Sequence, residues 1–365
     1  MARSRLPLGL RLHIIGLLAV LSLSFLTVVQ AQPPAKPADK NAGPTEFFFC
    51  FWNVENLFDD KDDKRRDVDE EFDDPFAANG KMRQEKLDHL ADILLKMNDG
   101  NGPDIIACVE VESVRAADLL RATLNKRLEE AKADPKLKYT QVAMKNLDAG
   151  RHIAPCVITR LNVAHAFTKL HGRDLRILES RLMVNGHELC IVASHWTSQL
   201  KQDNGGNGDL GRNKYADAIF EVFAAANKKS IHTDFLVCGD FNDTPDAKPI
   251  FGNLGAVPDA KRVVPTEKEP LFLNLMGGKD PNRFGTIWYN NKPLIYDHIC
   301  VSPGMLDGDG WSVRPETVSV VTEGLIRGTR REPWRFGNPN SAPIGGRGYS
   351  DHFPVTVKLK VQPKK

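Results

Sequence analysis

Short apolar runs recur along the chain and alternate with stretches that have helical spacing. Leu, Ala and Met at helical spacing predict helices over Met82–Met97, after Ser113 and over Asn213–Asn227. Strands mixed with helices, without an internal repeat, predict a single α/β domain in which helices cover sheets. The apolar runs that predict strands are Phe47–Trp52, Ile105–Val109, Tyr139–Ala143, Cys156–Thr159, Arg181–Val184, Glu188–Ser194, Phe235–Cys238, Tyr296–Val301 and Pro354–Leu359.

Residues 1–31 predict an export signal. They carry three arginines and no acidic residue, then the apolar run Ile14–Val29, and end on Val29-Gln30-Ala31, a small-x-small cleavage pattern. An uncleaved membrane anchor is the alternative, but the run is short for a spanning helix of about 20 residues. Residues 32–45 are rich in Pro, Ala and Lys, as in a flexible spacer. We therefore expect a folded domain over residues 46–365, located in the periplasm or outside the cell, without stable membrane association after cleavage.

The charges of the chain nearly balance. There are 49 Lys and Arg against 47 Asp and Glu, and removing the three arginines of residues 1–31 leaves 46 against 47. A nearly neutral domain has no overall field to hold a polyanion, so a phosphate contact must come from a local basic patch or a metal. With 41% hydrophobic residues the chain can bury a large core, which excludes disordered and collagen-like classes.

The six cysteines each lie in or beside an apolar run. Buried free Cys behaves as a small hydrophobe, and no Cys or His spacing indicates zinc. We favour core packing over disulfides, although the sequence leaves the pairing open. The residues are Cys50, Cys108, Cys156, Cys190, Cys238 and Cys300.

Polar residues stand where six of the apolar runs end, and they are the candidate functional residues. In α/β proteins chemistry gathers where strands end and loops converge. One such residue is typical of a cap or a turn, but six ends together indicate a site. The residues are Asn53, Glu110, His195, Asp240, Asn242, Asp297, Asp351 and His352.

The chemical types of these residues fit together. Asp240 and Asn242 lie two apart, so on an extended segment both side chains face the same way and can hold one metal or one water. His195 and His352 can bond a phosphoryl oxygen or take a proton, and Asp297 would fix the tautomer of a neighbouring His. Metal-assisted hydrolysis of a phosphate ester requires such a set. The hard oxygen ligands, which suit Mg²⁺ or Mn²⁺ rather than zinc, are Glu110, Asp240, Asn242 and Asp351.

Segments that contain these residues stand in a recognisable order. They are Phe51–Asp59 (FWNVENLFD), Pro103–Ile106 leading to Glu110-Val111-Glu112, Ser194-His195-Trp196, Gly239–Pro245 (GDFNDTP), Gly285-Thr286, Tyr296-Asp297-His298 and Ser350–Val355 (SDHFPV). In this order they resemble the endonuclease/exonuclease/phosphatase superfamily, which has the deoxyribonuclease-I-like fold. The opening NVENLFD resembles a bacterial exported branch.

The resemblance implies a four-layer α/β sandwich, with two mixed sheets face to face, helices outside and a divalent-metal site at one edge. It implies that Glu110 is the principal metal ligand, with Asn53 and Asp351 near it. Asp240 and Asn242 are implied to orient the attacking water and the phosphate.

The resemblance also implies roles for the histidines. His352, supported by Asp297, would be the acid/base partner or the imidazolium that stabilises the oxyanion, and His195 would bond a non-bridging oxygen. The chain departs from the family's pattern after His195, because Thr197-Ser198-Gln199 stands where the branch has Pro-Ser-Arg. Val109 replaces the Gln that often precedes the metal-binding Glu. Gly150-Arg151 stands near the place where relatives have Arg-Gly.

A basic segment precedes Asp351. Arginines interleaved with an aromatic residue could grip a phosphate backbone and stack a base; the alternative is a surface loop with the tryptophan packed down. The candidate substrate-binding residues are Arg327, Arg330, Arg331 and Trp334, with Arg335 beside them. The acidic run Asp59–Asp74 lacks the Gly and spacing of a calcium loop, so we expect a solvated surface loop there.

The sequence thus predicts an exported phosphoesterase that depends on Mg²⁺ or Mn²⁺. The leading interpretation is a monomeric, nuclease-like phosphodiesterase that hydrolyses DNA or RNA by in-line attack of water. One alternative is a lipid or inositol phosphoesterase, which would need an exposed aromatic docking hairpin if it acted on membranes. Another is a catalytically silent binding module on the same fold; such a module would be expected to have lost one of the key residues, and this chain keeps them all.

Overall fold

The computed structural model of the chain describes residues 45–64, 69–200, 208–340, 343 and 345–363. The predicted export signal over residues 1–31 and all but the last residue of the predicted spacer lie outside the described residues, so both stay predictions. No helix in the described part combines the length and apolar character needed to cross a membrane.

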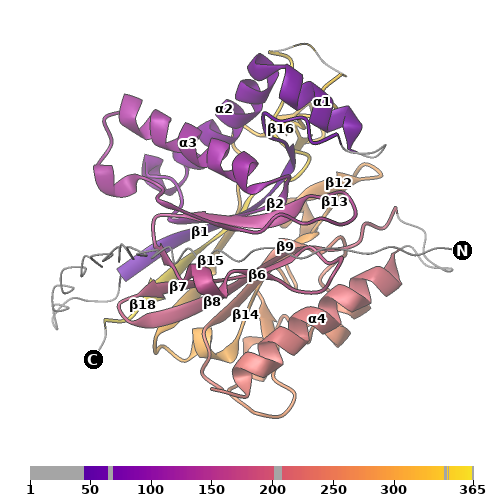
Figure 1. Cartoon of the computed structure of the whole chain (residues 1–365). Coiled ribbons are helices and arrows are strands. Elements are labelled where there is room, and N and C mark those ends of the chain that lie inside the picture. Colours follow the sequence, from indigo (N-terminus) through magenta and orange to yellow (C-terminus); the bar gives the residue numbers. More distant parts are fainter. Residues whose placement is uncertain (1–44, 65–68, 201–207, 341–342, 344, 364–365) are drawn as a thin grey trace, which may run out of the picture. The chain divides into compact units, whose positions relative to one another are not determined.

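Two mixed β-sheets form the centre of the fold (Figure 1). The first has the strand order β15 (Trp311–Val320), β18 (Val355–Val361), β1 (Thr45–Leu57), β2 (Ile105–Val111), β4 (Ala154–Thr159) and β3 (Gln141–Met144). The second has the order β10 (Ala256–Val257), β11 (Phe272–Asn274), β14 (Asp297–Val301), β9 (Phe235–Asp240), β8 (His187–His195), β7 (Ile177–Val184) and β5 (Asn162–Val163), with β6 (Lys169–Leu170) also on β7. The pairs β1–β2, β8–β9 and β10–β11 are parallel, and the other pairs are antiparallel.

Helices and short hairpins complete the described structure. The α-helices are α1 (Glu70–Ala78), α2 (Gly80–Lys96), α3 (Val114–Glu130), α4 (Asp209–Asn227) and the short α5 (Pro281–Phe284). Two small hairpins pair β12 (Ile287–Tyr289) with β13 (Lys292–Leu294) and β16 (Ile326–Arg327) with β17 (Glu332–Pro333). Single helical turns lie at Asn98–Gly100, Pro135–Leu137, His165–Phe167, Pro249–Asn253, Ala260–Arg262 and Pro303–Leu306.

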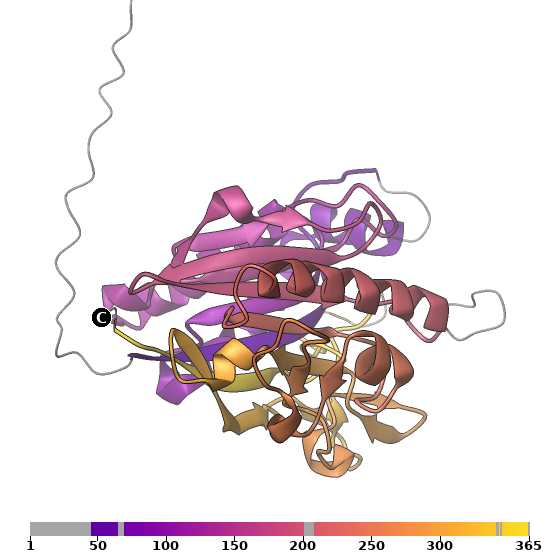
Figure 2. The same cartoon turned by 90° about the horizontal axis from the view of Figure 1, so that it is seen from below.

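Side-chain alternation along the central strands explains the four layers. Phe49 and Phe51 of β1 pack into the core between the two sheets, whereas Cys50 and Trp52 pack against α2 and α3. Successive residues of a strand point to opposite faces, so a strand covered on both faces reads as a continuous apolar run. In the second sheet, Val192 of β8 packs toward α4, which lies across the outer face of that sheet (Figure 2). The predicted two-sheet sandwich with outer helices is confirmed.

The prediction of core packing for the cysteines is also confirmed. All six are buried and unpaired. Cys108 and Cys156 face each other across β2 and β4, and Cys50 packs in the same cluster.

Among the elements that differ from the sequence-based expectation are the acidic run and strand β15. The acidic run is only partly a loop, because α1 begins at Glu70 and packs Phe72 and Phe76 against Phe58. Its acidic first turn suits the positive end of the helix dipole. Strand β15 was not predicted, because Pro315 interrupts its pattern; the structure places this proline at an irregularity of an edge strand, where the missing N–H is tolerated.

Close approach of β8 and β9 generates a prediction about stability. A side chain at Gly239 would clash with the carbonyl oxygen of Ser194 and lie 2.8 Å from the ring of Phe241. We expect Gly239→Ala to lower the free energy of unfolding by about 1–3 kcal/mol, measured by urea denaturation. Gly252→Ala is the matched control, because its Cβ would make only an ordinary 3.6 Å contact. Equal stability of the two variants would contradict this account of the strand spacing.

Candidate active site

A cavity of about 610 Å³ lies where several central strands end. Six of the predicted residues line it: Glu110, His195, Asp240, Asn242, Asp351 and His352. The other two, Asn53 and Asp297, hydrogen-bond to lining residues. The structure therefore brings together all eight residues that stand at strand ends in the sequence, while their individual roles stay predictions.

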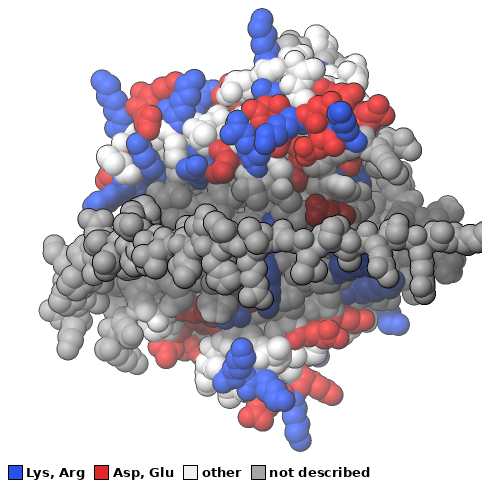
Figure 3. All heavy atoms as spheres, in the orientation of Figure 1, with Lys and Arg blue, Asp and Glu red and all other residues white. Residues whose placement is uncertain are grey.

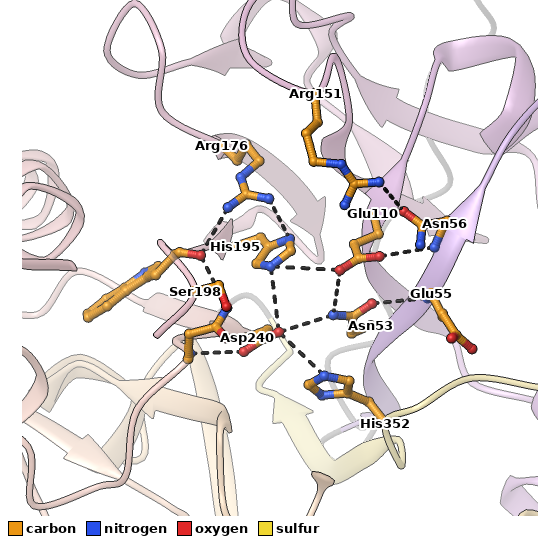
Figure 4. Close-up of polar contacts among 12 residues, drawn as sticks. Asn53, Glu55, Asn56, Glu110, Arg151, Arg176, His195, Ser198, Asp240 and His352 are labelled. Carbon is orange, nitrogen blue, oxygen red and sulfur yellow. Dashed lines mark hydrogen bonds and ion pairs between the residues drawn. The ribbon is translucent and has the colours of Figure 1, made fainter. Parts of the chain in front are cut away.

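The Asn53 amide joins the two sheets at the floor of this cavity (Figure 4). Its Nδ2 donates to Glu110 Oε1 (3.2 Å) and to Asp240 Oδ2 (3.1 Å). The Asn53 Oδ1 accepts from the Glu55 backbone N–H (3.0 Å), which fixes the orientation of the amide. Asn53 and Glu110 belong to the first sheet and Asp240 to the second, so one side chain sets the distance between carboxylates from different layers.

Local backbone irregularity directs Glu110 into the cavity. The pairing of β1 with β2 shifts register between Asn53 and Leu57, and Glu110 adopts a φ of 64°. A left-handed conformation at a non-glycine residue costs of order 1–3 kcal/mol and persists only where the surroundings hold it. The Asn56 N–H donates to Glu110 Oε2 (3.1 Å), so both carboxylate oxygens of Glu110 are held.

His352 and Asp297 form a buried ion pair. His352 Nδ1 lies 2.7 Å from Asp297 Oδ2, and its Nε2 lies 3.6 Å from Asp240 Oδ2. Burial lowers the pKa of His352, but the carboxylates of Asp297 and Asp240 outweigh it and raise this pKa well above that of free histidine. His352 is therefore an imidazolium at neutral pH, with its Nε2–H directed toward the carboxylate cluster.

His195 has the opposite character. Arg176 Nη1 lies 3.0 Å from His195 Nδ1, and a guanidinium can only donate, so Nδ1 must be the acceptor. The ring proton is then on Nε2, which lies 3.6 Å from Asp240 Oδ2 and 3.8 Å from Glu110 Oε1. Burial and the positive charges of Arg176, His352 and Arg151 lower the pKa of His195 well below its usual value. His195 is a neutral hydrogen-bond donor.

The carboxylate cluster fits a hard divalent cation. Burial raises the pKa of Asp240 to about 7, and the Asp297 and Glu110 charges add to this while His352 opposes it. A bound cation would offset the negative charge of the Asp240, Asp297 and Glu110 carboxylates. Carboxylate and amide oxygens are the ligands that Mg²⁺ and Mn²⁺ prefer. Asp240, Asp297 and His352 also present ligand atoms within 4.8 Å of one another. We favour Glu110 as the ligand, because Asp297 and His352 already bind each other and Asn53 faces the carboxylates with its Nδ2 group.

Basic residues also line the cavity. Arg151, Arg176 and Lys214 line it, and the sequence had pointed to Arg151 only weakly and to the other two not at all. Arg151 donates to Asp69 Oδ1 (2.9 Å) and Asn56 Oδ1 (2.7 Å). The register of β7 on β8 pairs Ile177 with Ser194 and so sets Arg176 beside His195. The apolar pattern of the sequence predicts that this strand begins at Arg181, so it does not indicate that Arg176 lies beside His195.

Gln199, which stands where the branch has arginine, braces the Asn242 loop. Its Nε2 donates to the Asn242 carbonyl oxygen (3.1 Å) and to Asp243 Oδ1 (3.3 Å). Asn242 itself takes a φ of 53° and donates from Nδ2 to the Trp196 carbonyl oxygen (3.2 Å). At this departure from the family's pattern the side chain supports a loop, and Arg176 donates to the same Trp196 carbonyl oxygen as Asn242 does.

The basic segment lies beside the cavity rather than in its lining. Arg327 and Arg331 are exposed, Arg330 donates to Asn291 Oδ1, and Trp334 is half-buried with its ring edge-on to Tyr349. None of the four lines the cavity described above. Arg335 does reach the site, since it pairs with Glu55 (2.7 Å) and lies 3.4 Å from Asp351.

Comparison with known proteins identifies the family. The sequence profile of the endonuclease/exonuclease/phosphatase family matches residues 48–361. This chain belongs to that family. The three activities in the family's name are all hydrolyses of phosphoesters, so the chain has the fold of a phosphoester hydrolase.

Solved structures with this fold include family relatives of low sequence identity. Truncated TDP2 from Caenorhabditis elegans has 12% identity and a TM-score of 0.50, covering 87% of this chain and 97% of that one. Mannosyl-6-phosphatase from Bacteroides thetaiotaomicron has 15% identity, a TM-score of 0.49 and coverage of 86% and 99%. A double mutant of Staphylococcus aureus beta toxin with bound magnesium ions has 13% identity, a TM-score of 0.49 and coverage of 86% and 99%. The likeness to the Caenorhabditis elegans structure shows the fold alone. No curated protein matches the chain.

The carboxylate cluster predicts metal binding that depends on Glu110. Replacing the carboxylate by an amide of the same shape in Glu110→Gln should weaken Mn²⁺ or Mg²⁺ binding by about 10²-fold, measured by isothermal titration calorimetry. Asp174→Asn is the matched control, because Asp174 lines the same cavity outside the cluster. Unchanged affinity in Glu110→Gln would remove Glu110 from the metal site.

The ion pair predicts the protonation of His352. Asp297→Asn removes the carboxylate that raises the pKa of His352 most. This pKa should therefore fall, as measured by nuclear magnetic resonance titration of the imidazole. The imidazolium is the form present below the pKa, and the variant should therefore lose it at a lower pH than the wild type does. A His352 pKa that stays in place would show that Asp297 is not its counterion.

Proposed function

We propose that this protein is an exported phosphodiesterase that depends on a divalent metal and hydrolyses nucleic acids. The observation that carries the proposal is that one cavity is lined both by the carboxylates of Glu110 and Asp240 and by the guanidinium groups of Arg151 and Arg176. A metal and a phosphate can bind side by side there. Export rests on the pattern of residues 1–31. The proposal also includes Mg²⁺ or Mn²⁺ as the metal ion and a monomeric enzyme.

The residues of the cavity account for in-line attack of water on phosphorus. Asp240, with a pKa of about 7, accepts a proton from the attacking water, and Asn242 orients that water or a phosphate oxygen. The His195 Nε2–H donates to a non-bridging oxygen. The His352 imidazolium stabilises the added negative charge and protonates the leaving oxygen.

A divalent cation held by Glu110, with Asn53 and Asp351 near it, would supply Lewis-acid stabilisation of the phosphoryl oxygens. Arg151 and Arg176, which line the same cavity, hold the phosphate. Their guanidinium groups suit a phosphate because planar N–H donors can bond two of its oxygens at once.

Nucleic acid is the substrate class that the surroundings favour. On the face shown in Figure 3, Lys and Arg are interspersed with Asp and Glu over the coloured parts, so no broad single-sign field is visible there. Attraction to phosphate then depends on local groups, in the cavity and beyond it at Arg330. Basic groups both inside and outside a catalytic cavity suit a substrate that carries more than one phosphate.

The first test is hydrolysis by the purified protein with and without Mg²⁺, against plasmid DNA, RNA, sphingomyelin and inositol phosphates. We expect metal-dependent cleavage of DNA or RNA, reduced by about 10²-fold or more in His352→Ala. Exposed Glu323→Gln controls for preparation and folding. Turnover of lipid or inositol substrates alone would overturn the substrate assignment. Activity that needs neither metal nor His352 would overturn the mechanism.

A further inference from the structure

The β12–β13 hairpin directs an aromatic side chain toward the mouth of the cavity. Its turn residues Asn290 and Asn291 have φ values of 49° and 62°, as the mirror-image turns favoured in two-residue hairpins require. Side chains alternate along β12, so Ile287 and Tyr289 line the cavity while Trp288 faces the other way and packs edge-on against Phe353.

The hairpin is attached to the segment that carries His352. Ile287 forms an isolated bridge with His352, and the Phe353 N–H donates to the Thr286 carbonyl oxygen (2.8 Å). Tyr289 is two residues further along the strand, about 7 Å beyond Ile287 at the usual strand rise. The position of the Tyr289 ring is therefore set relative to the catalytic histidine.

Tyr289 is more exposed than Trp334. Tyr289 is 41% exposed, one of the large hydrophobic side chains that the described fold leaves in solvent. Trp334 is half-buried against Tyr349, so the base-stacking role suggested by the basic segment has a better candidate in Tyr289. Arg330 donates to Asn291 Oδ1 and so holds its guanidinium next to the hairpin turn.

Four residues lie in a row that leads away from the catalytic residues of the cavity. His352 comes first, then the apolar Ile287, then the aromatic Tyr289, and finally the cationic Arg330 at the turn. A nucleotide chain repeats phosphate, sugar and base, and a stacking ring followed by a cation suits that repeat.

We propose that Tyr289 stacks on the base of a nucleotide next to the scissile phosphate and that Arg330 contacts the following phosphate. This assignment rests on the proposed nuclease function and adds the element that selects nucleotides. Stacking acts in the bound substrate as well as in the transition state, so it should lower KM more than it raises kcat.

The test uses labelled single-stranded oligonucleotides, DNA and RNA, each with one abasic residue at a successive position. In the wild type, cleavage should fall about 10-fold at the linkage that the abasic residue flanks. Tyr289→Ala should lose about 10-fold in kcat/KM on the intact strand, mainly through KM, and show no further loss on the abasic strand. Tyr289→Phe should behave as the wild type.

Two controls separate stacking from general damage. Phe167→Ala removes another exposed aromatic ring, away from the cavity lining, and should leave cleavage unchanged. Urea midpoints of all variants report folding. If Tyr289→Ala cleaves intact strands as well as the wild type does, or still responds to the abasic residue, the stacking assignment is wrong.

The salt dependence of binding tests the proposed contact between Arg330 and the following phosphate. Arg330→Gln should lower the slope of log affinity against log salt by about one, as the loss of a single phosphate contact does. Arg262, which is exposed and does not line the cavity, provides the matched variant Arg262→Gln, which should leave the slope nearly unchanged. Equal effects of the two substitutions would overturn the Arg330 contact.

The wild type on intact strands reports the proposed function by itself. If it cleaves none of them, the proposed function fails and the stacking assignment fails with it. Cleavage without any effect of Tyr289 overturns the stacking assignment alone. If the wild type instead binds and hydrolyses sphingomyelin vesicles and Tyr289→Ala loses that binding, the hairpin is a membrane contact and the proposal is overturned.

Discussion

The hydrogen bonds of the Asn53 amide hold the active-site floor together. One NH₂ group bridges carboxylates that belong to different sheets, Glu110 and Asp240. Two acids buried close together repel, and burial already makes Asp240 hard to ionise. The arrangement persists because apolar cores on both faces of each sheet fix the strands that carry these residues. The free-energy cost of holding Glu110 and Asp240 close together is thus offset by apolar packing elsewhere. The resulting pair of carboxylates is ready to bind a cation.

Charged neighbours give the two buried histidines opposite roles. Both rings are equally removed from water, and burial alone would make both neutral. Asp297 holds the proton on His352, while Arg176 excludes one from Nδ1 of His195. The cavity therefore has a cationic group and a neutral donor on either side of Asp240. A phosphoryl group that gains charge during attack needs one group to balance that charge and another to orient its oxygens.

The strand ends and the core could be predicted from the sequence because each depends on local pattern. A continuous apolar run indicates a strand covered on both faces, and the polar residue that ends it indicates the edge of the sheet. Ser113 likewise marks the start of α3, whose first turn it caps by accepting from the Ala116 N–H (3.0 Å). Arg176 could not be found in this way, because its place beside His195 depends on the register between β7 and β8. Register is set by the whole sheet, and the apolar pattern near Arg176 is too weak to show where β7 begins.

The same limit explains why the sequence favoured Trp334 over Tyr289. Trp334 stands among arginines, which is the composition expected of a nucleic-acid contact. Its burial is decided by distant residues: the ring packs edge-on to Tyr349, and the backbone of Gly348 passes so close to Trp334 that a side chain there would clash. The nearest basic residue to Tyr289 in sequence is Lys292, its partner across the hairpin, and folding adds Arg330 at the adjacent turn. The residues of the candidate site therefore stand at strand ends, where local pattern shows them, whereas the proposed base contact depends on a hairpin and a distant arginine that only folding brings together.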